Sequence, residues 1–122
     1  MRKSDLKRYE KLLLQKREEV MERVRALRAS EAEGSGEEAP DLGDRALTTA
    51  SRDMLYLLST GERAVLRRVE NSLARVSAGT YGKCLHCDGK IQKGRLDAVP
   101  WARYCIQCQE LLDRGEFTDQ EP

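Results

Sequence analysis

The chain has 122 residues, of which 39% are hydrophobic, 35% are charged and 5% are aromatic. This composition excludes a thick core, but it allows thin helical layers that each bury one apolar stripe. The formal net charge is +1, so the excess of positive charge typical of a DNA-binding domain is absent. There is neither an apolar run approaching the roughly 20 residues of a membrane span nor a secretory signal. We therefore expect a cytoplasmic protein that does not contact membranes.

The first part of the chain predicts one long helix over residues 4–32, with Ser4 as its N-cap. Its apolar seam recurs every seven residues, at Leu6, Leu13, Val20 and Leu27. Lys16 and Arg23 stand where a second apolar row would continue, so the seam is narrow and is flanked by long basic side chains. This pattern is typical of a two-helix coiled coil.

Residues 33–40 contain glycines, a serine and a proline, which predict a turn or a flexible tip. A second helix begins at Pro40 or Asp41, changes phase near residues 59–61 and ends at a Gly79 C-cap. Two long helices with a short connection pack antiparallel. The sequence therefore predicts a mainly α fold in which residues 1–78 form a helical hairpin with its tip near 33–45. An ordinary hairpin that only buries its own stripe is the alternative.

The remaining chain divides into residues 79–115, which contain all the cysteines, and an acidic tail over 116–122. Within the first of these parts, residues 105–114 predict a short helix. The tail is expected to be frayed.

The four cysteines form two C-x-x-C pairs separated by 17 residues: Cys84 with Cys87, and Cys105 with Cys108. This spacing is a strong zinc signature, because each turn lets two thiolates converge on one ion. Four protein ligands leave no position for water, so the sequence predicts one structural Zn²⁺. Four thiolates around Zn²⁺ carry a net charge of −2. We expect it to be offset by basic side chains nearby in the sequence, which are Lys83, Lys90, Lys93 and Arg103. Backbone N–H groups of the two turns are also expected to donate to the sulfurs.

Other uses of the cysteines are weaker. Two disulfides conflict with a reducing compartment, and a redox C-x-x-C occurs singly near a βαβ pattern. His86 could replace one cysteine as a ligand, although the all-cysteine set is complete without it. Asp41 and Asp44 lack a pocket that would shift their pKa values, and no nucleotide-binding or nucleophile motif is present. We therefore expect that the chain is not an enzyme.

From Thr80 to Gln109 the sequence resembles the zinc finger of the DksA/TraR family. The resemblance includes Tyr81-Gly82 and the Arg-Leu-x-Ala-x-Pro run of residues 95–100, besides the four cysteines. A second match is an Asp-x-x-Asp-x-Ala motif at the expected tip, formed by Asp41, Asp44 and Ala46. Together the matches extend over roughly residues 41–110.

The resemblance implies a monomeric transcription regulator whose hairpin enters the secondary channel of bacterial RNA polymerase. The tip aspartates would then approach the catalytic region, and initiation would change without direct promoter binding. The alternative is that the aspartates only cap a helix at a solvated end of the hairpin. Many family members act with the alarmone ppGpp, and responsive members have a lysine directly after the fourth cysteine. Here that residue is Gln109, so part of the ppGpp site differs.

Two other function classes stay open. A zinc-ribbon nucleic-acid binder would use the basic residues of 83–103 on phosphates, with Trp101 or Tyr104 stacking on bases. A structural or adaptor hairpin would pair through its apolar stripe and would not respond to substitution of Asp41 or Asp44.

Overall fold

The computed structural model describes residues 1–35 and 55–121. Four α-helices and one short 3-10 helix are present in these ranges: α1 (Lys3–Ser35), η1 (Leu55–Leu57), α3 (Thr60–Ala78), α4 (Lys93–Ala98) and α5 (Ile106–Asp113). They contain no β-strand, only an isolated antiparallel bridge between Lys83 and Lys90. The mainly α fold is therefore confirmed. No helix in the described ranges has both the length and the apolarity needed to cross a membrane.

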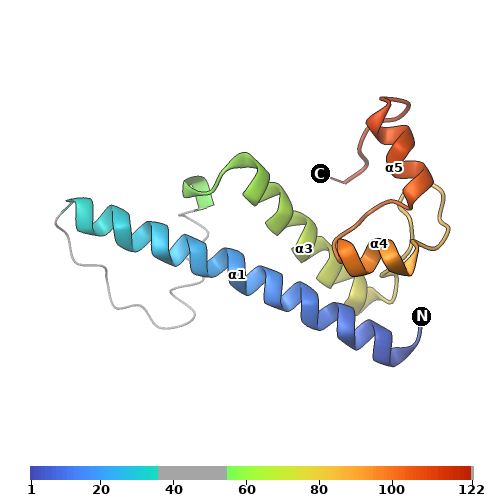
Figure 1. Cartoon of the computed structure of the whole chain (residues 1–122), viewed down its shortest axis with the longest axis horizontal. Helices are drawn as coiled ribbons and strands as arrows, with labels where there is room; N and C mark the ends of the chain where they lie inside the picture. Colours follow the sequence, from blue (N-terminus) through green and yellow to red (C-terminus); the bar gives the residue numbers. More distant parts are fainter. Residues whose placement is uncertain (36–54, 122) are drawn as a thin grey trace.

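Helix α1 is the longest helix in the described ranges, and its 33 residues correspond to a length of about 50 Å. It extends along the whole molecule, with α3 packed on it and with α4 and α5 gathered at its N-terminal end (Figure 1). The predicted helix over 4–32 is confirmed, but Ser4 is not its cap. The helix begins at Lys3, and the Leu6 amide donates to the Arg2 carbonyl over 3.0 Å.

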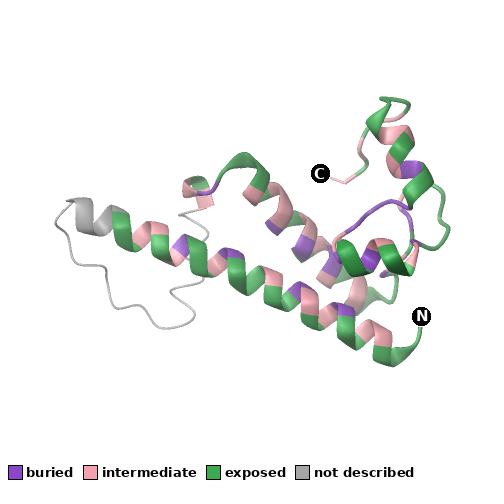
Figure 2. Cartoon of the chain, viewed as in Figure 1, coloured by how far each residue is buried: buried purple, intermediate pink, exposed green. Residues whose placement is uncertain are grey.

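The buried stripe of α1 follows the true helical period rather than the expected heptad. Its buried side chains are Tyr9, Leu13, Val20 and Val24, while Leu6 and Leu27 are half-buried. Buried and half-buried residues recur along one side of the helix (Figure 2). A straight helix has 3.6 residues per turn, so a contact face drifts out of a strict seven-residue repeat. This drift brings Val24 into the core, with an exposed fraction of 1%, and leaves Arg23 outside, paired with Glu62.

The predicted phase change at residues 59–61 is a complete helix break. After η1, Ser59 adopts an extended conformation and caps α3. Its hydroxyl accepts from the Glu62 amide and the Glu62 carboxylate accepts from the Ser59 amide, both over 3.1 Å. This Ser-x-x-Glu capping box is visible in the sequence, although the phase change alone suggested only a kink or slip. At the other end, the Gly79 C-cap is confirmed, with a φ of 79°.

Replacing Ser59 with alanine is expected to destabilise the protein by about 1 kcal/mol, because the first turn of α3 loses a capped amide. Ser77→Ala is the matched control, since Ser77 is exposed in the last turn of the same helix and an exposed serine contributes little. Denaturant unfolding of the zinc-loaded protein measures both. Equal midpoints for the two variants would contradict the capping role.

Candidate metal centre

The four cysteines predicted as ligands lie together at the end of the molecule formed by α4 and α5. Their sulfur atoms all lie within 4.8 Å of one another, and Cys87 Sγ and Cys105 Sγ are 3.9 Å apart. A Zn²⁺ ion with Zn–S bonds of about 2.3 Å requires sulfur separations of about 3.8 Å around a tetrahedron. Three of the cysteines are buried and Cys87 is exposed. The donor set and its spacing therefore fit one zinc ion with no open coordination position.

The first C-x-x-C turn is shaped by short backbone hydrogen bonds. The Cys84 amide donates to the Gly89 carbonyl over 2.7 Å, and the Asp88 amide donates to the Cys84 carbonyl over 3.1 Å. Asp88 takes a left-handed φ of 61°, which an aspartate tolerates better than most residues. The Gly89 amide then points at Cys87 Sγ over 3.4 Å, and a Cβ at Gly89 would lie 3.2 Å from the same sulfur. Glycine at this position keeps the amide close to the thiolate.

The second C-x-x-C turn opens helix α5. Cys105 is the N-cap residue of this helix, and the Gln109 amide donates to the Cys105 carbonyl over 2.9 Å. The side chain of Gln92 holds the turn, because its Oε1 accepts from the Ile106 amide over 3.2 Å. The amides of the first helical turn also favour negative charge on the two sulfurs.

The environment of the sulfurs suits a metal thiolate. Burial raises the pKa of Cys84, but the amides of Cys87, Cys105 and His86 donate to its sulfur and bring the pKa down to about 7. Burial and the neighbouring sulfurs raise the pKa of Cys108. A bound cation supplies the positive charge that deprotonates such a thiol.

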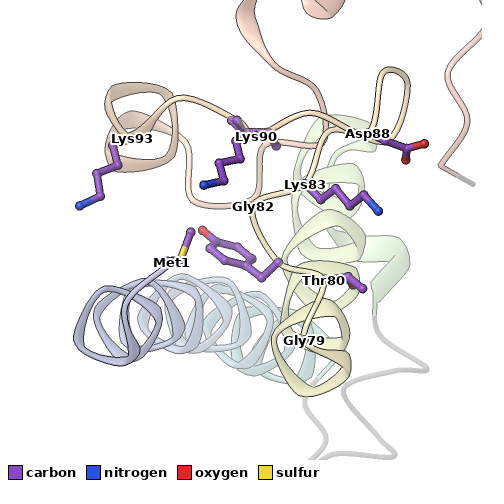
Figure 3. Close-up of a pocket in the computed structure, with 10 residues that line it drawn as sticks. Met1, Gly79, Thr80, Gly82, Lys83, Asp88, Lys90 and Lys93 are labelled. Atoms are coloured by element: carbon purple, nitrogen blue, oxygen red, sulfur yellow. The ribbon is translucent and has the colours of Figure 1, made fainter.

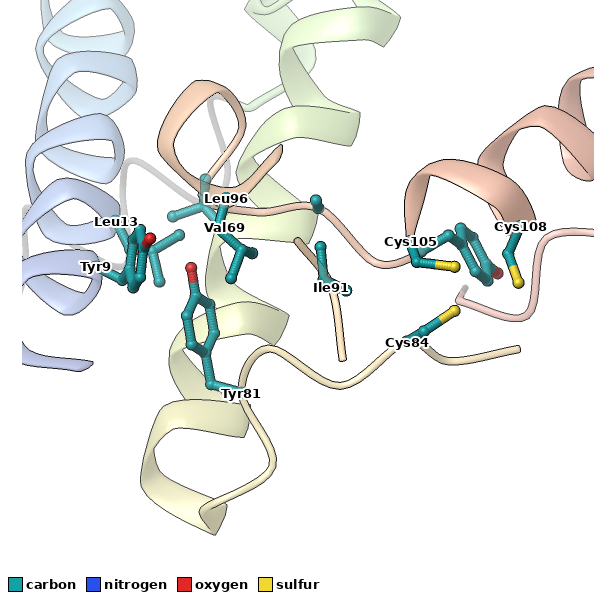
Figure 4. Close-up of a cluster of buried hydrophobic side chains, with 11 residues drawn as sticks. Tyr9, Leu13, Val69, Tyr81, Cys84, Ile91, Leu96, Cys105 and Cys108 are labelled. Atoms are coloured by element: carbon teal, nitrogen blue, oxygen red, sulfur yellow. The ribbon is translucent and has the colours of Figure 1, made fainter. Parts of the chain in front are cut away.

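One continuous core joins the metal centre to the hairpin. Tyr81 and Leu96 lie beside Leu13 of α1 and Val69 of α3, and Ile91 lies between this group and the cysteines (Figure 4). Polar contacts reinforce this junction. The Tyr9 hydroxyl donates to Asp97 over 2.7 Å, Arg8 contacts the same carboxylate at 3.0 Å, and Lys93 lies 2.9 Å from Asp5. The centre is thereby fixed to the N-terminal end of α1.

The acidic tail, residues 116–121, is not frayed as predicted but packs back on the metal module. Asp119 pairs with the buried Arg103 and accepts from the Tyr104 hydroxyl over 2.9 Å. Glu121 pairs with Arg75 of α3 at 2.7 Å. The ring of Phe117 stacks on His86 with centroids 3.9 Å apart. Burial alone would raise the pKa of Asp119, but Arg103, the Glu121 amide and Tyr104 lower it.

Asp119→Asn is expected to lower the free energy of unfolding by about 2 kcal/mol, because the mostly buried Arg103 guanidinium loses its counter-charge. Glu116→Gln, an exposed change in the same tail, should alter it by less than about 0.5 kcal/mol. Fluorescence of Trp101, the single tryptophan, follows the denaturation. An Asp119 variant as stable as the wild type would show that the docked tail adds nothing to stability.

The basic residues near the cysteines do not act as one charge-compensating group. Arg103 pairs with Asp119 and Lys93 pairs with Asp5, while Lys83 and Lys90 extend from the exposed loop of the first turn. His86 is exposed and lies outside the sulfur cluster. Backbone amides donate to the sulfurs, as expected from the two turns. Among these donors, Gly89 is the one whose residue type is a turn signal in the sequence. The tip residues Asp41, Asp44 and Ala46 lie outside the described residues.

Comparison with known proteins identifies the family. The model of the prokaryotic dksA/traR C4-type zinc finger matches residues 79–114. The solution structure of the DnaK suppressor protein of Agrobacterium tumefaciens is 33% identical, with a TM-score of 0.61, and the match covers 85% of this chain and 90% of that one. The chain belongs to the DksA/TraR family. It carries the C4-type zinc-binding module of that family.

Two further matches extend over nearly the whole chain. An uncharacterised protein of Aquifex aeolicus is 34% identical over 97% of this chain and 83% of its own length. The RNA polymerase-binding transcription factor DksA of Caulobacter vibrioides is 28% identical over 95% of this chain and 81% of its own length. The named DksA relative is a transcription factor rather than an enzyme, in agreement with the sequence prediction.

Proposed function

We propose that this chain is a transcription factor that binds bacterial RNA polymerase, with its helical hairpin reaching into the secondary channel. The observation that carries the proposal is the match to a protein named as an RNA polymerase-binding transcription factor over 95% of the chain, hairpin and zinc module together. In this proposal residues 1–78 are the arm, residues 79–115 are the base that rests on the channel rim, and Asp41, Asp44 and Ala46 act near the polymerase active site.

Zinc has a structural role in this proposal. Cys84, Cys87, Cys105 and Cys108 would hold the ion, and the closed donor set leaves no position for a substrate. The ion would link the loop that follows α3 to helix α5, and the continuous core then transmits this rigidity to α1.

Dependence on ppGpp is not included in the proposal. A cavity of about 260 Å³ beside the metal centre is lined by the basic residues Arg68, Arg95 and Arg103. Gln109 also lines it, at the position where ppGpp-responsive members have a lysine. Arg103 already pairs with Asp119, so part of this positive charge is neutralised within the chain.

Two alternatives are less compatible with the geometry. Of the two rings that a zinc-ribbon nucleic-acid binder could stack on bases, Tyr104 has an exposed fraction of 0% and cannot do so. Trp101 is partly buried, and Lys16 Nζ lies 5.7 Å from the centroid of its ring. A hairpin that pairs with a second copy needs a free apolar stripe, but Tyr9, Leu13, Val20 and Val24 are buried within the chain.

Titration of core RNA polymerase into fluorescently labelled protein tests the proposal. We expect saturable binding at physiological salt that excess duplex DNA does not compete away, and no binding to DNA alone. Steeply salt-dependent binding to bare DNA or RNA would support the nucleic-acid alternative instead. Absence of polymerase binding would contradict the proposal.

A further inference from the structure

A second cavity lies on the side of the metal module that faces the start of α1. It has a volume of about 460 Å³ and is lined by ten residues: Met1, Gly79, Thr80, Tyr81, Gly82, Lys83, Asp88, Lys90, Ile91 and Lys93. This volume lies within the range of about 300–1,000 Å³ that is usual for binding pockets. None of the four cysteines belongs to its lining.

The interior of this cavity is apolar. Tyr81 and Ile91 belong to the buried core that joins the module to α1. The side chain of Met1, which is 55% exposed, lies across the backbone of Gly82, where a Cβ would be only 2.8 Å from Met1 Cε. Gly82 also has a φ of 86°, which favours glycine. A methionine at such a mouth adapts its shape readily to an inserted apolar group.

The rim of the cavity is basic on two sides. Lys90 and Lys93 extend toward the side of Met1, whereas Lys83 extends toward the opposite side, next to Asp88 (Figure 3). All three lysines are exposed, and within the described residues only Lys93 has a carboxylate partner, Asp5 at 2.9 Å. A ligand that fits must therefore place an apolar group inside and negative charges on both sides of it.

We propose that this cavity is a docking site for an acidic segment of a partner protein, with one apolar side chain inserted and flanking carboxylates on Lys83 and Lys90. A protein segment matches the arrangement better than a compact anion, because the lysines stand apart around an open apolar mouth rather than converging on one point. The site goes beyond the proposed polymerase contacts, and its test uses the zinc-loaded chain alone.

The probe is the peptide acetyl-Glu-Glu-Leu-Glu-Glu-amide, titrated into ¹⁵N-labelled, zinc-loaded protein and followed by NMR. We expect saturable shifts at the amides of Tyr81, Gly82 and Ile91. The double variant Lys83→Gln with Lys90→Gln should weaken binding at least about tenfold. Lys11→Gln with Arg17→Gln, an equal loss of charge on the exposed face of α1, should leave it unchanged.

A second peptide with glycine in place of the leucine separates apolar insertion from simple charge attraction. We expect its affinity to fall at least about fivefold. Equal affinity for both peptides, or equal loss in both double variants, would overturn the proposal. Tighter binding of a single-stranded RNA oligonucleotide at the same amides would assign the surface to nucleic acid and would also overturn it.

Discussion

Cys84→Ser is expected to unfold the metal module and to remove its bound zinc. Cys84 is fully buried and lies within 4.8 Å of the other three sulfurs, so a serine there removes one of four ligands and leaves a polar hydroxyl in the core. Structural zinc contributes on the order of 10 kcal/mol to the folding of small modules.

Zinc content by mass spectrometry and thermal unfolding by circular dichroism measure this effect together. His86→Ala is the matched control, because His86 lies between two of the cysteines but is exposed and stacks only on Phe117. The control should keep one zinc per chain and most of its thermal stability. A Cys84 variant that retains the full cooperative transition without zinc would show that the metal is not structural. Chelation of the wild type should reproduce the unfolding.

Asp44→Asn is expected to abolish the effect of the protein on transcription while leaving polymerase binding intact. In the proposed function this carboxylate makes its contact only at the tip, whereas affinity comes from the arm and base. A hydrogen bond to a charged group contributes about 1.5–3 kcal/mol, so its loss changes the lifetime of the promoter open complex by about tenfold or more.

The lifetime of the open complex is measured after heparin challenge, with the wild type and with this variant, on a promoter where the wild type shortens it. Glu37→Gln is the control, because it removes a nearby carboxylate outside the Asp-x-x-Asp-x-Ala motif. We expect Glu37→Gln to act like the wild type and Asp44→Asn to leave the lifetime as it is without the factor. If Asp44→Asn shortens the lifetime as the wild type does, the aspartates are only a solvated end of the hairpin.

The sequence predicted the elements whose signals are local. The C-x-x-C spacing identified the four cysteines that converge, and the apolar period with Gly79 identified α1 and the end of α3. Helix α4 was missed because six residues are too few to show a period.

The docking of the tail was missed because it depends on pairs distant in the sequence. Asp119 meets Arg103, and Glu121 meets Arg75 across 46 positions. A short acidic stretch at a C-terminus is predicted to be disordered from its sequence alone, because the basic residues that bind it become neighbours only in the folded chain. The burial of Val24 was also missed, because the contact face of a straight helix shifts gradually away from a strict seven-residue repeat.

A photo-crosslinking amino acid at Leu42, between the two tip aspartates, tests the channel most directly. The zinc-loaded protein is bound to core RNA polymerase and irradiated, and the crosslinked peptides are identified by mass spectrometry. The proposed function predicts crosslinks to polymerase segments that line the secondary channel close to the catalytic site. The same amino acid at Leu14, an exposed residue of α1 near the base, should give crosslinks only at the rim. Crosslinks from Leu42 to the outer surface of the polymerase, or none at all while the complex forms, would contradict it.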